Sequence, residues 1–188
     1  MTIVSDDIQK AAGILKKGGI VAYPTESSYA LGCQIGKEAV KKIYEIKQRP
    51  KNKGMTYIVP SLEVAGKYAV LSNNEKRIVK KLMPGRLTLV ARNKIGGEFV
   101  FRIPSHPVAL KLAKAFGKPI TATSANISGK EAIYNPKKIF DLWNGKIDMI
   151  LDFGILPKKR PSTIACVFDK IKICRRGHVT KKQIEDAL

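Results

Sequence analysis

The sequence predicts a single α/β domain, residues 1–188, in which a mixed (parallel and antiparallel) twisted sheet is flanked by helices. Three observations lead to this fold class: helical and strand patterns alternate, two pairs of strand patterns are joined as hairpins, and the 188 residues are 44% hydrophobic. Hairpins combined with crossover units exclude a purely parallel sheet. No repeat, low-complexity segment or change of composition marks a linker between domains.

The first half of the chain alternates helix and strand. Ser5 can cap a helix that runs to about Lys17, where two glycines end it. Apolar spacing then predicts a buried strand "IVAY", a helix over residues 38 to 48 and a strand "MTYIV". Two short helices follow, and Ser72 with Glu75 forms a capping box for the second one.

The second half contains the two predicted hairpins. One joins "RLTLVAR" to "EFVFRIP" through residues 93–97, and the other joins "STIACVF" to "IKICR" through residues 169–170. Between them, "HPVALKLAKAFG" is typical of a helix with Pro107 in its first turn, and "PITATSAN" of a strand that enters a turn of small residues. "NPKKIFDLWNG" indicates a capped helix, and Thr180 with Gln183 caps the last one.

The formal net charge of +20 is the strongest compositional feature. A surplus of this size attracts polyanions, because neutralising phosphates releases the counterions condensed on nucleic acid. We therefore expect contact with tRNA or double-stranded RNA through a basic surface. An enrichment in Lys that reflects genome composition or a hot-living host is the alternative explanation.

Nothing in the sequence indicates a membrane or a metal site. Asp6 and Asp7 stand where a signal peptide carries positive charge, and no apolar run is long enough to span a bilayer, so we expect a cytoplasmic protein. The three cysteines, Cys33, Cys166 and Cys174, form no CxxC pair and stand at no metal-ligand spacing from a histidine. Reduced, structural cysteines are therefore expected.

Four cations crowd the junction between a helical pattern and a strand pattern: Lys47, Arg49, Lys51 and Lys53. A solvated loop would account for them. However, Pro50 fixes the backbone directly after Arg49, and the strand begins shortly beyond. The cluster therefore lies at the end of an element, where ligand sites often lie.

The sequence lacks the common catalytic motifs. It has neither a GxxxxGK[ST] loop nor a GxGxxG turn after a strand, and Glu26 is the only acid in "YPTESSYALG", so hydrolysis by paired carboxylates is not expected. Ser124, His106 and Asp152 could form a hydrolase triad, but no GxSxG motif surrounds the serine.

Three turns instead combine hydroxyl and amide side chains. Such groups can bind carboxylate, ribose or phosphate oxygens, and nearby cations can offset the charge of a phosphoryl group. The alternative is ordinary turn chemistry, because Ser, Thr and Asn stabilise turns without any ligand. The three sets are Thr25, Ser27 and Ser28; Thr123, Ser124 and Asn126; and Ser162 and Thr163.

Several segments, taken in order, resemble the motifs of the YrdC family. "YPTESSYALGC" resembles its opening motif, "KQRP" its KxR signature, "PGRLTLV" its Pro-Gly-x-Leu-Thr segment, "FRIPSHP" its Arg-x-Pro-x-His-Pro segment and "TATSANISG" its SxN signature. "PSTI" and "RRG" resemble its C-terminal part, and the matches run from residue 18 to residue 177.

This resemblance implies an enzyme, a nucleotidyltransferase that makes threonylcarbamoyl-AMP and pyrophosphate from L-threonine, bicarbonate and ATP. A separate transferase would then move the threonylcarbamoyl group to adenosine in tRNA. The resemblance also implies a mixed α/β fold around a positively charged cavity, and Mg²⁺ bound together with ATP.

The resemblance further implies roles for particular residues. Lys47 and Arg49, from KxR, would be catalytic and hold the ATP phosphates, with Lys53 as a third cation. Thr25 would seat the substrate threonine. The remaining nucleotide- and substrate-binding residues would be Thr123, Ser124, Asn126, Arg102, Ser162, Arg175 and His106. No protein metal ligand is expected.

Two other functions remain open at this point. A non-catalytic RNA-binding module would account for the charge but would form no adenylate. A carbamoyl-transfer domain of the hydrogenase-maturation type would share the fold, but this sequence lacks the acylphosphatase-like and zinc-finger segments of those proteins.

Overall fold

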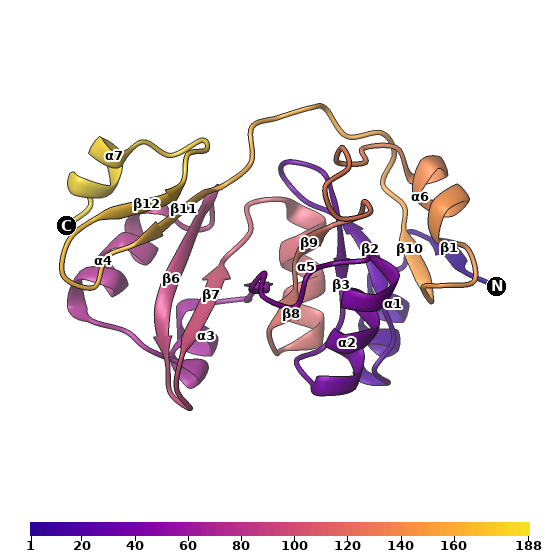
Figure 1. Ribbon diagram of the computed structural model, residues 1–188, viewed down its shortest axis with the longest axis horizontal. Helices are drawn as coiled ribbons and strands as arrows, with labels where there is room; N and C mark the ends of the chain where they lie inside the picture. Colours follow the sequence, from indigo (N-terminus) through magenta and orange to yellow (C-terminus); the bar gives the residue numbers. More distant parts are fainter.

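The computed structural model describes residues 1–36 and 38–188 in full, and Lys37 by its backbone alone. The strands form two sheets, each surrounded by helices in its own half of the molecule (Figure 1). An extended segment, residues 152–162, runs from one half to the other and carries no regular secondary structure. We call the two sheets N-terminal and C-terminal, after the chain end that lies in the same half.

The N-terminal sheet is mixed. Three neighbouring strands are parallel, β1 (Ile3–Ser5), β10 (Met149–Leu151) and β2 (Val21–Pro24). The next two, β3 (Tyr29–Gly32) and β9 (Thr123–Ser124), each run antiparallel to the strand before them in the sheet. Because Pro24 pairs with Tyr29, the four residues between β2 and β3 form a tight connection at one end of the sheet.

The C-terminal sheet is also mixed, and its strand order is β12-β11-β6-β7-β4-β8 with β5 paired to β6. Two antiparallel hairpins, β6–β7 and β11–β12, are joined by the parallel pair β6–β11. The strands are β4 (Thr56–Ile58), β5 (Ala69–Val70), β6 (Leu87–Asn93), β7 (Glu98–Arg102), β8 (Ile120–Thr121), β11 (Thr163–Cys166) and β12 (Lys172–Arg175).

Helices cover both sheets (Figure 1). Around the N-terminal sheet lie α1 (Ile8–Lys16), α2 (Lys37–Ile46), α5 (Pro107–Phe116) and α6 (Pro136–Trp143). Beside the C-terminal sheet lie α3 (Leu62–Tyr68), α4 (Asn73–Leu82) and α7 (Lys181–Glu185). None of the helices that the structure describes combines the length and the apolar composition needed to cross a membrane.

Alternation along the strands gives the N-terminal sheet two buried faces. Val21 and Tyr23 pack into the cluster of α1 and α5, whereas Ala22 and Tyr29 pack into the cluster that holds Trp143 of α6. The Trp143 indole, fully buried, donates to the Ala125 carbonyl at 2.7 Å. Packing on both faces fixes the ends of β2, β3 and β9.

Most predicted elements are confirmed. The β6–β7 and β11–β12 hairpins are antiparallel, and the capping boxes of Ser72 with Glu75 and of Thr180 with Gln183 are both formed. Helix α5 begins at Pro107 and ends at Phe116, and it is capped by Gly117, whose φ of 76° lies in the left-handed region that glycine adopts easily.

The predicted start of the first helix is wrong. Ser5 belongs to strand β1, which pairs with β10, and the helix cap is Asp7, whose Oδ1 accepts from Gln9 N and Lys10 N at 2.8 and 3.0 Å. Pairing with a strand from the far end of the sequence therefore outweighs the local capping tendency of Ser5.

Candidate active site

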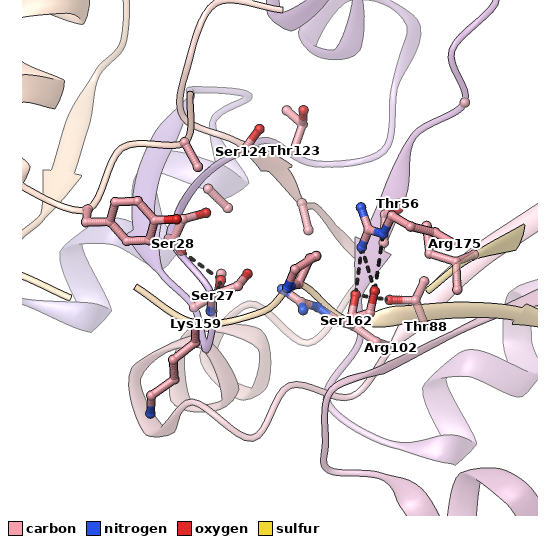
Figure 2. Close-up of a pocket in the computed structure, with 18 of the residues that line it drawn as sticks. Ser27, Ser28, Thr56, Thr88, Arg102, Thr123, Ser124, Lys159, Ser162 and Arg175 are labelled. Carbon is pink, nitrogen blue, oxygen red and sulfur yellow. Dashed lines mark hydrogen bonds between the residues drawn. The ribbon is translucent and has the colours of Figure 1, made fainter. Parts of the chain in front are cut away.

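A cavity of about 420 Å³ lies between the two sheets (Figure 2). Among the residues that the structure describes, no Asp or Glu lines it, so its charged groups are all cationic. Hydroxyl groups and cations converge here from both sheets, an arrangement suited to an anionic ligand that carries hydroxyls. The polar lining consists of Thr25, Ser27, Ser28, Arg49, Thr56, Thr88, Arg102, Thr123, Ser124, Tyr134, Lys159, Ser162 and Arg175.

The connection between β2 and β3 presents one wall. Thr25, only 3% exposed, closes this loop because its N–H and its hydroxyl both donate to the Ser28 carbonyl, at 3.0 and 2.7 Å. Pro24 ends the strand just before it. Ser27 and Ser28 consequently lie at the cavity, as Figure 2 shows.

The end of β9 and the turn that follows it, residues 124–130, form a second wall that is closed by its own side chains. Ser124 Oγ donates to Asn126 Oδ1, and Asn126 Nδ2 donates to the Lys130 carbonyl. Thr123 and Ser124 line the cavity, whereas Asn126 is 7% exposed and lies behind them. The predicted SxN pair therefore divides into one lining residue and one that shapes the turn.

Lys47 lies beneath this turn. It is the C-cap of α2 and is 1% exposed, and its ammonium donates to the main-chain carbonyls of Ser124 and Asn126. Burial, together with the charge of Arg49, lowers the pKa of Lys47 to about 8. Lys47 does not line the cavity, and its ammonium supports the turn from behind.

Arg49 is the member of the KxR pair that lines the cavity. Its Nη2 donates to the Gly54 carbonyl at 2.8 Å, and its guanidinium lies 6.0 Å from the centre of the Tyr44 ring. Its Nε is buried without a hydrogen-bond partner. Lys53 is exposed and lies outside the cavity lining.

The C-terminal sheet supplies a third wall. Ser162 Oγ lies 2.8 Å from Thr88 Oγ1, and Arg175 Nη2 donates to the Ser162 carbonyl at 2.8 Å and to its hydroxyl at 3.1 Å. The chain packs closely here, because a Cβ on Gly177 would lie 2.5 Å from backbone atoms of Pro161 and Ser162. Glycine at this position therefore lets the C-terminal segment support Ser162.

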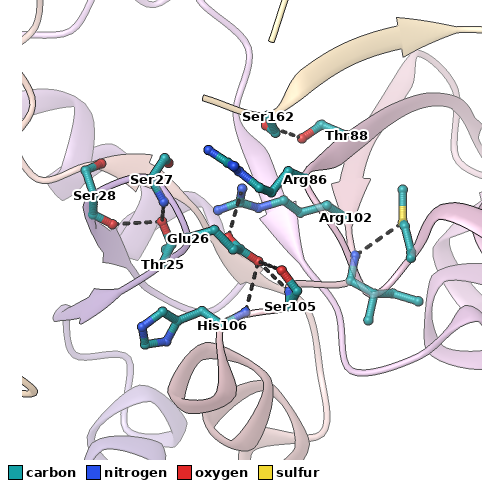
Figure 3. A network of polar contacts seen from close by, with 12 residues as sticks. Thr25, Glu26, Ser27, Ser28, Arg86, Thr88, Arg102, Ser105, His106 and Ser162 are labelled. Atoms are coloured by element: carbon teal, nitrogen blue, oxygen red, sulfur yellow. Dashed lines mark hydrogen bonds and ion pairs between the residues drawn. The ribbon is translucent and has the colours of Figure 1, made fainter. Parts of the chain in front are cut away.

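A buried ion pair between Glu26 and Arg102, which lines the cavity, joins the two halves (Figure 3). Glu26 Oε2 lies 3.3 Å from Arg102 Nη1, and the two side chains are 7% and 8% exposed. Glu26 Oε1 accepts from Ser105 N, from His106 N at 3.1 Å and from Ser105 Oγ at 3.2 Å. Burial alone would raise the pKa of Glu26, but the Arg102 charge and the backbone N–H groups outweigh it and hold this pKa below its ordinary value.

His106 is the N-cap of α5, and its ring lies outside the cavity lining. Its Nδ1 is buried without a hydrogen-bond partner, and burial lowers its pKa. The Ser124 hydroxyl donates to Asn126 rather than to histidine. The described contacts therefore do not assemble the alternative hydrolase triad of Ser124, His106 and Asp152.

The structure brings seven of the eleven predicted site residues to the cavity. These are Thr25, Arg49, Arg102, Thr123, Ser124, Ser162 and Arg175. Lys47, Lys53, Asn126 and His106 are not among the lining residues. Their assigned roles, like those of the seven, stay predictions.

Sequence reasoning missed several lining residues, namely Thr56, Thr88, Tyr134 and Lys159. Thr88 lies inside the "PGRLTLV" motif, so this motif could have identified it as a candidate site residue. Lys159 belongs to a run of three cations on the segment between the sheets, whereas Thr56 and Tyr134 carry no signal of their own.

The described residues contain no group of three or more His, Cys, Asp or Glu side chains that could hold a metal ion.

Comparisons with known proteins relate this chain to one family. The Sua5/YciO/YrdC family model, described as telomere recombination, matches residues 13–177. A curated threonylcarbamoyl-AMP synthase of Psychromonas ingrahamii is 32% identical over 179 residues, covering 87% of this chain and 94% of the relative.

Two solved structures share the fold. Pyrococcus abyssi Sua5 complexed with L-threonine superposes with a TM-score of 0.90 at 30% identity, covering all of this chain (100%) but 61% of Sua5. Escherichia coli YciO superposes with a TM-score of 0.86 at 30% identity, covering 98% of this chain and 100% of YciO. The chain thus spans about three fifths of the Sua5 chain, and the whole of YciO.

Proposed function

This chain belongs to the Sua5/YciO/YrdC family, and from that membership we propose that it is a threonylcarbamoyl-AMP synthase. The enzyme would convert L-threonine, bicarbonate and ATP into threonylcarbamoyl-AMP and pyrophosphate. The observation that carries the proposal is the cavity between the sheets, in which hydroxyls and cations converge without a lining carboxylate among the described residues. The P. ingrahamii relative, similar over nearly its whole length, supports the same activity.

The chemistry fits this lining, because bicarbonate, ATP and the carbamate formed from threonine are anions. The threonine amine loses a proton and bonds to carbon dioxide derived from bicarbonate, which gives a carbamate. A carbamate oxygen then attacks the α-phosphorus of ATP, and the bond to the leaving pyrophosphate breaks. Such a reaction depends on positioning and on neutralising charge more than on protein general bases.

Each wall of the cavity would contribute a different group. Arg49, Arg102 and Arg175 would bind the carboxylate and phosphate oxygens, since a guanidinium fork matches both. Thr25 and Ser124 would bind the threonine and the nucleotide through hydroxyl groups. Lys47 would keep its predicted role through its positive charge and through the turn that it supports, while Lys53, Asn126 and His106 would act from outside the lining.

Mg²⁺ would enter with ATP. The lining offers the ion hydroxyl groups and no described carboxylate, so phosphate oxygens and water would supply most of its ligands. Bound there, the ion would neutralise part of the phosphate charge.

The test is an omission experiment on the purified protein. Pyrophosphate release from ATP should require both L-threonine and bicarbonate. L-serine should be a poorer substrate, because it lacks a methyl group whose burial contributes about 1 kcal/mol. Equal turnover with L-alanine, or turnover without bicarbonate, would contradict the proposed reaction.

A second function, RNA binding, is supported by the net charge of +20. We propose that the basic surface binds tRNA or double-stranded RNA, which would place the protein beside the transferase that uses its product in the cytoplasm. Affinity for a duplex RNA should fall steeply as salt rises and should depend little on sequence. An affinity that does not change with salt would contradict this proposal.

A further inference from the structure

Glu26 is an acidic residue in a chain that carries 35 Lys and Arg against 15 Asp and Glu, yet its carboxylate is almost fully buried. It does not line the cavity itself. It stands between Thr25 and Ser27, in the loop whose hydroxyl groups do line the cavity. The loop therefore lines the cavity with hydroxyl-bearing residues, while its one carboxylate stays outside the lining.

The two oxygens of this carboxylate have different partners, as Figure 3 shows. Oε1 accepts from the backbone N–H groups of Ser105 and His106, which precede α5, where the positive end of the helix dipole favours an anion. Oε2 faces Arg102 Nη1 at 3.3 Å. One side chain thus ties the β2–β3 loop to helix α5 and to the end of strand β7.

Arg102 is held on one side only. Its guanidinium is 8% exposed and lines the cavity, and its Nε has no hydrogen-bond partner. A buried guanidinium with a free N–H is set up to donate to an incoming anion. Glu26 Oε2 has no hydrogen-bond partner of its own and contacts Arg102 Nη1 as an ion pair. The direction of the free Nε–H therefore depends on this ion pair.

We propose that Glu26 is a positioning residue that orients Arg102, and with it the Thr25–Ser28 loop, for a substrate anion. Through this contact the carboxylate determines whether the guanidinium of Arg102 is oriented to form paired hydrogen bonds with a carboxylate or phosphate group of the substrate. The kinetic consequence rests on the proposed function, whereas the orientation of Arg102 does not.

Glu26→Gln separates this role from a purely structural one. The amide oxygen of glutamine can still accept from Ser105 N and His106 N, so the cap on α5 is kept. Its NH₂ group can only donate, and so it cannot hold Arg102. The matched control is Glu98→Gln, an exposed acid at the other end of the strand that carries Arg102.

The experiment combines steady-state kinetics with an NMR measurement of the Arg102 side chain. In Glu26→Gln we expect the KM of L-threonine or of ATP to rise about tenfold, and the Glu98→Gln control to stay within about twofold of the wild type. The Arg102 Nε–H signal in NMR spectra, assigned by its loss in Arg102→Lys, should exchange faster with water in Glu26→Gln than in the wild type.

Folded Glu26→Gln protein with an unchanged Arg102 signal, or with both KM values unchanged, would overturn the proposal. If Glu26→Gln does not fold, Glu26→Asp replaces it, because the shorter carboxylate keeps the charge but cannot reach both partners; unchanged KM values and an unchanged signal there overturn the proposal equally. If the wild type makes no adenylate, the proposed function fails, and the NMR comparison still decides the role of Glu26.

Discussion

The buried ammonium of Lys47 donates to the main-chain carbonyl of Asn126, 79 residues further along the chain. A second bond to the Ser124 carbonyl makes Lys47 the support of the turn that carries Ser124 into the cavity. The end of α2 and the end of β9 are thereby fixed to each other. This relationship leads to two predictions.

Lys47→Met should lower both stability and turnover. Two buried carbonyl groups would lose their donor, which should cost about 1–3 kcal/mol of unfolding free energy. Turnover should fall by about two orders of magnitude, since a preorganised cation near the phosphates would be lost and Ser124 would no longer be held. Adenylate formation and thermal melting measure the two effects, and exposed Lys51→Met is the control. Wild-type turnover in Lys47→Met would remove Lys47 from the site.

The lowered pKa of Lys47 predicts a pH dependence. Between about pH 8 in the folded protein and 10.5, its ordinary value, the unfolded chain binds more protons at Lys47 than the folded chain does. The contribution of this group to the unfolding free energy therefore rises with pH across that window. Turnover should do the opposite and fall above about pH 8, because the turn loses its cation. A kcat profile that stays level to about pH 9.5 would contradict this prediction.

Arg49→Lys should lower turnover while the protein remains folded. Lysine keeps the charge but not the planar fork that binds phosphate through two parallel bonds. The expected loss is about 3 kcal/mol of transition-state stabilisation, on the order of a hundredfold in rate. Arg92→Lys, an exposed arginine on β6, should leave the rate near that of the wild type. Equal rates for Arg49→Lys and Arg92→Lys would show that Arg49 merely solvates the end of a helix.

Gly177→Ala should disturb the wall formed by Ser162. A Cβ would lie 2.5 Å from backbone atoms of Pro161, Ser162 and Thr163, so the strand that follows Ser162 must move. We expect a loss of about 1–3 kcal/mol in stability and a higher KM for at least one substrate. Gly66→Ala is the matched control, because nothing lies within 4 Å of that position in α3 and alanine there favours the helix by up to about 1 kcal/mol. A wild-type melting temperature in Gly177→Ala would show that the C-terminal segment adjusts freely.

What could be predicted from the sequence was local. The capping boxes of Ser72 and Thr180 and both hairpins depend on residues a few positions apart, and all four are present. The order of the family motifs likewise pointed to residues that meet in one cavity, such as Thr25, Ser124 and Ser162.

What could not be predicted depends on partners far away in the sequence. The local sequence predicts Ser5 as a helix cap, but in the structure it lies in β1, which pairs with β10. The local sequence shows Lys47 as a cation at the end of a helix. In the structure it is buried and donates to carbonyl groups of the turn after β9. The local sequence offers Glu26 no partner. In the structure its carboxylate accepts from the N–H groups of Ser105 and His106, about 80 residues later in the chain. For Ser5 a tertiary contact, rather than local tendency, decides the secondary structure, and for Lys47 and Glu26 such contacts decide burial and the direction of the pKa shift.

The most direct test of the proposed reaction follows the bicarbonate carbon and the α-phosphorus of ATP into one product. Wild-type protein is incubated with ATP, L-threonine and ¹³C-labelled bicarbonate, the nucleotides are separated, and their masses are measured by mass spectrometry. We predict an adenylate that carries threonine and one labelled carbon, formed together with an equal amount of pyrophosphate and absent when either co-substrate is omitted. ATP consumed without a labelled adenylate, or no ATP consumed by folded protein, would contradict it.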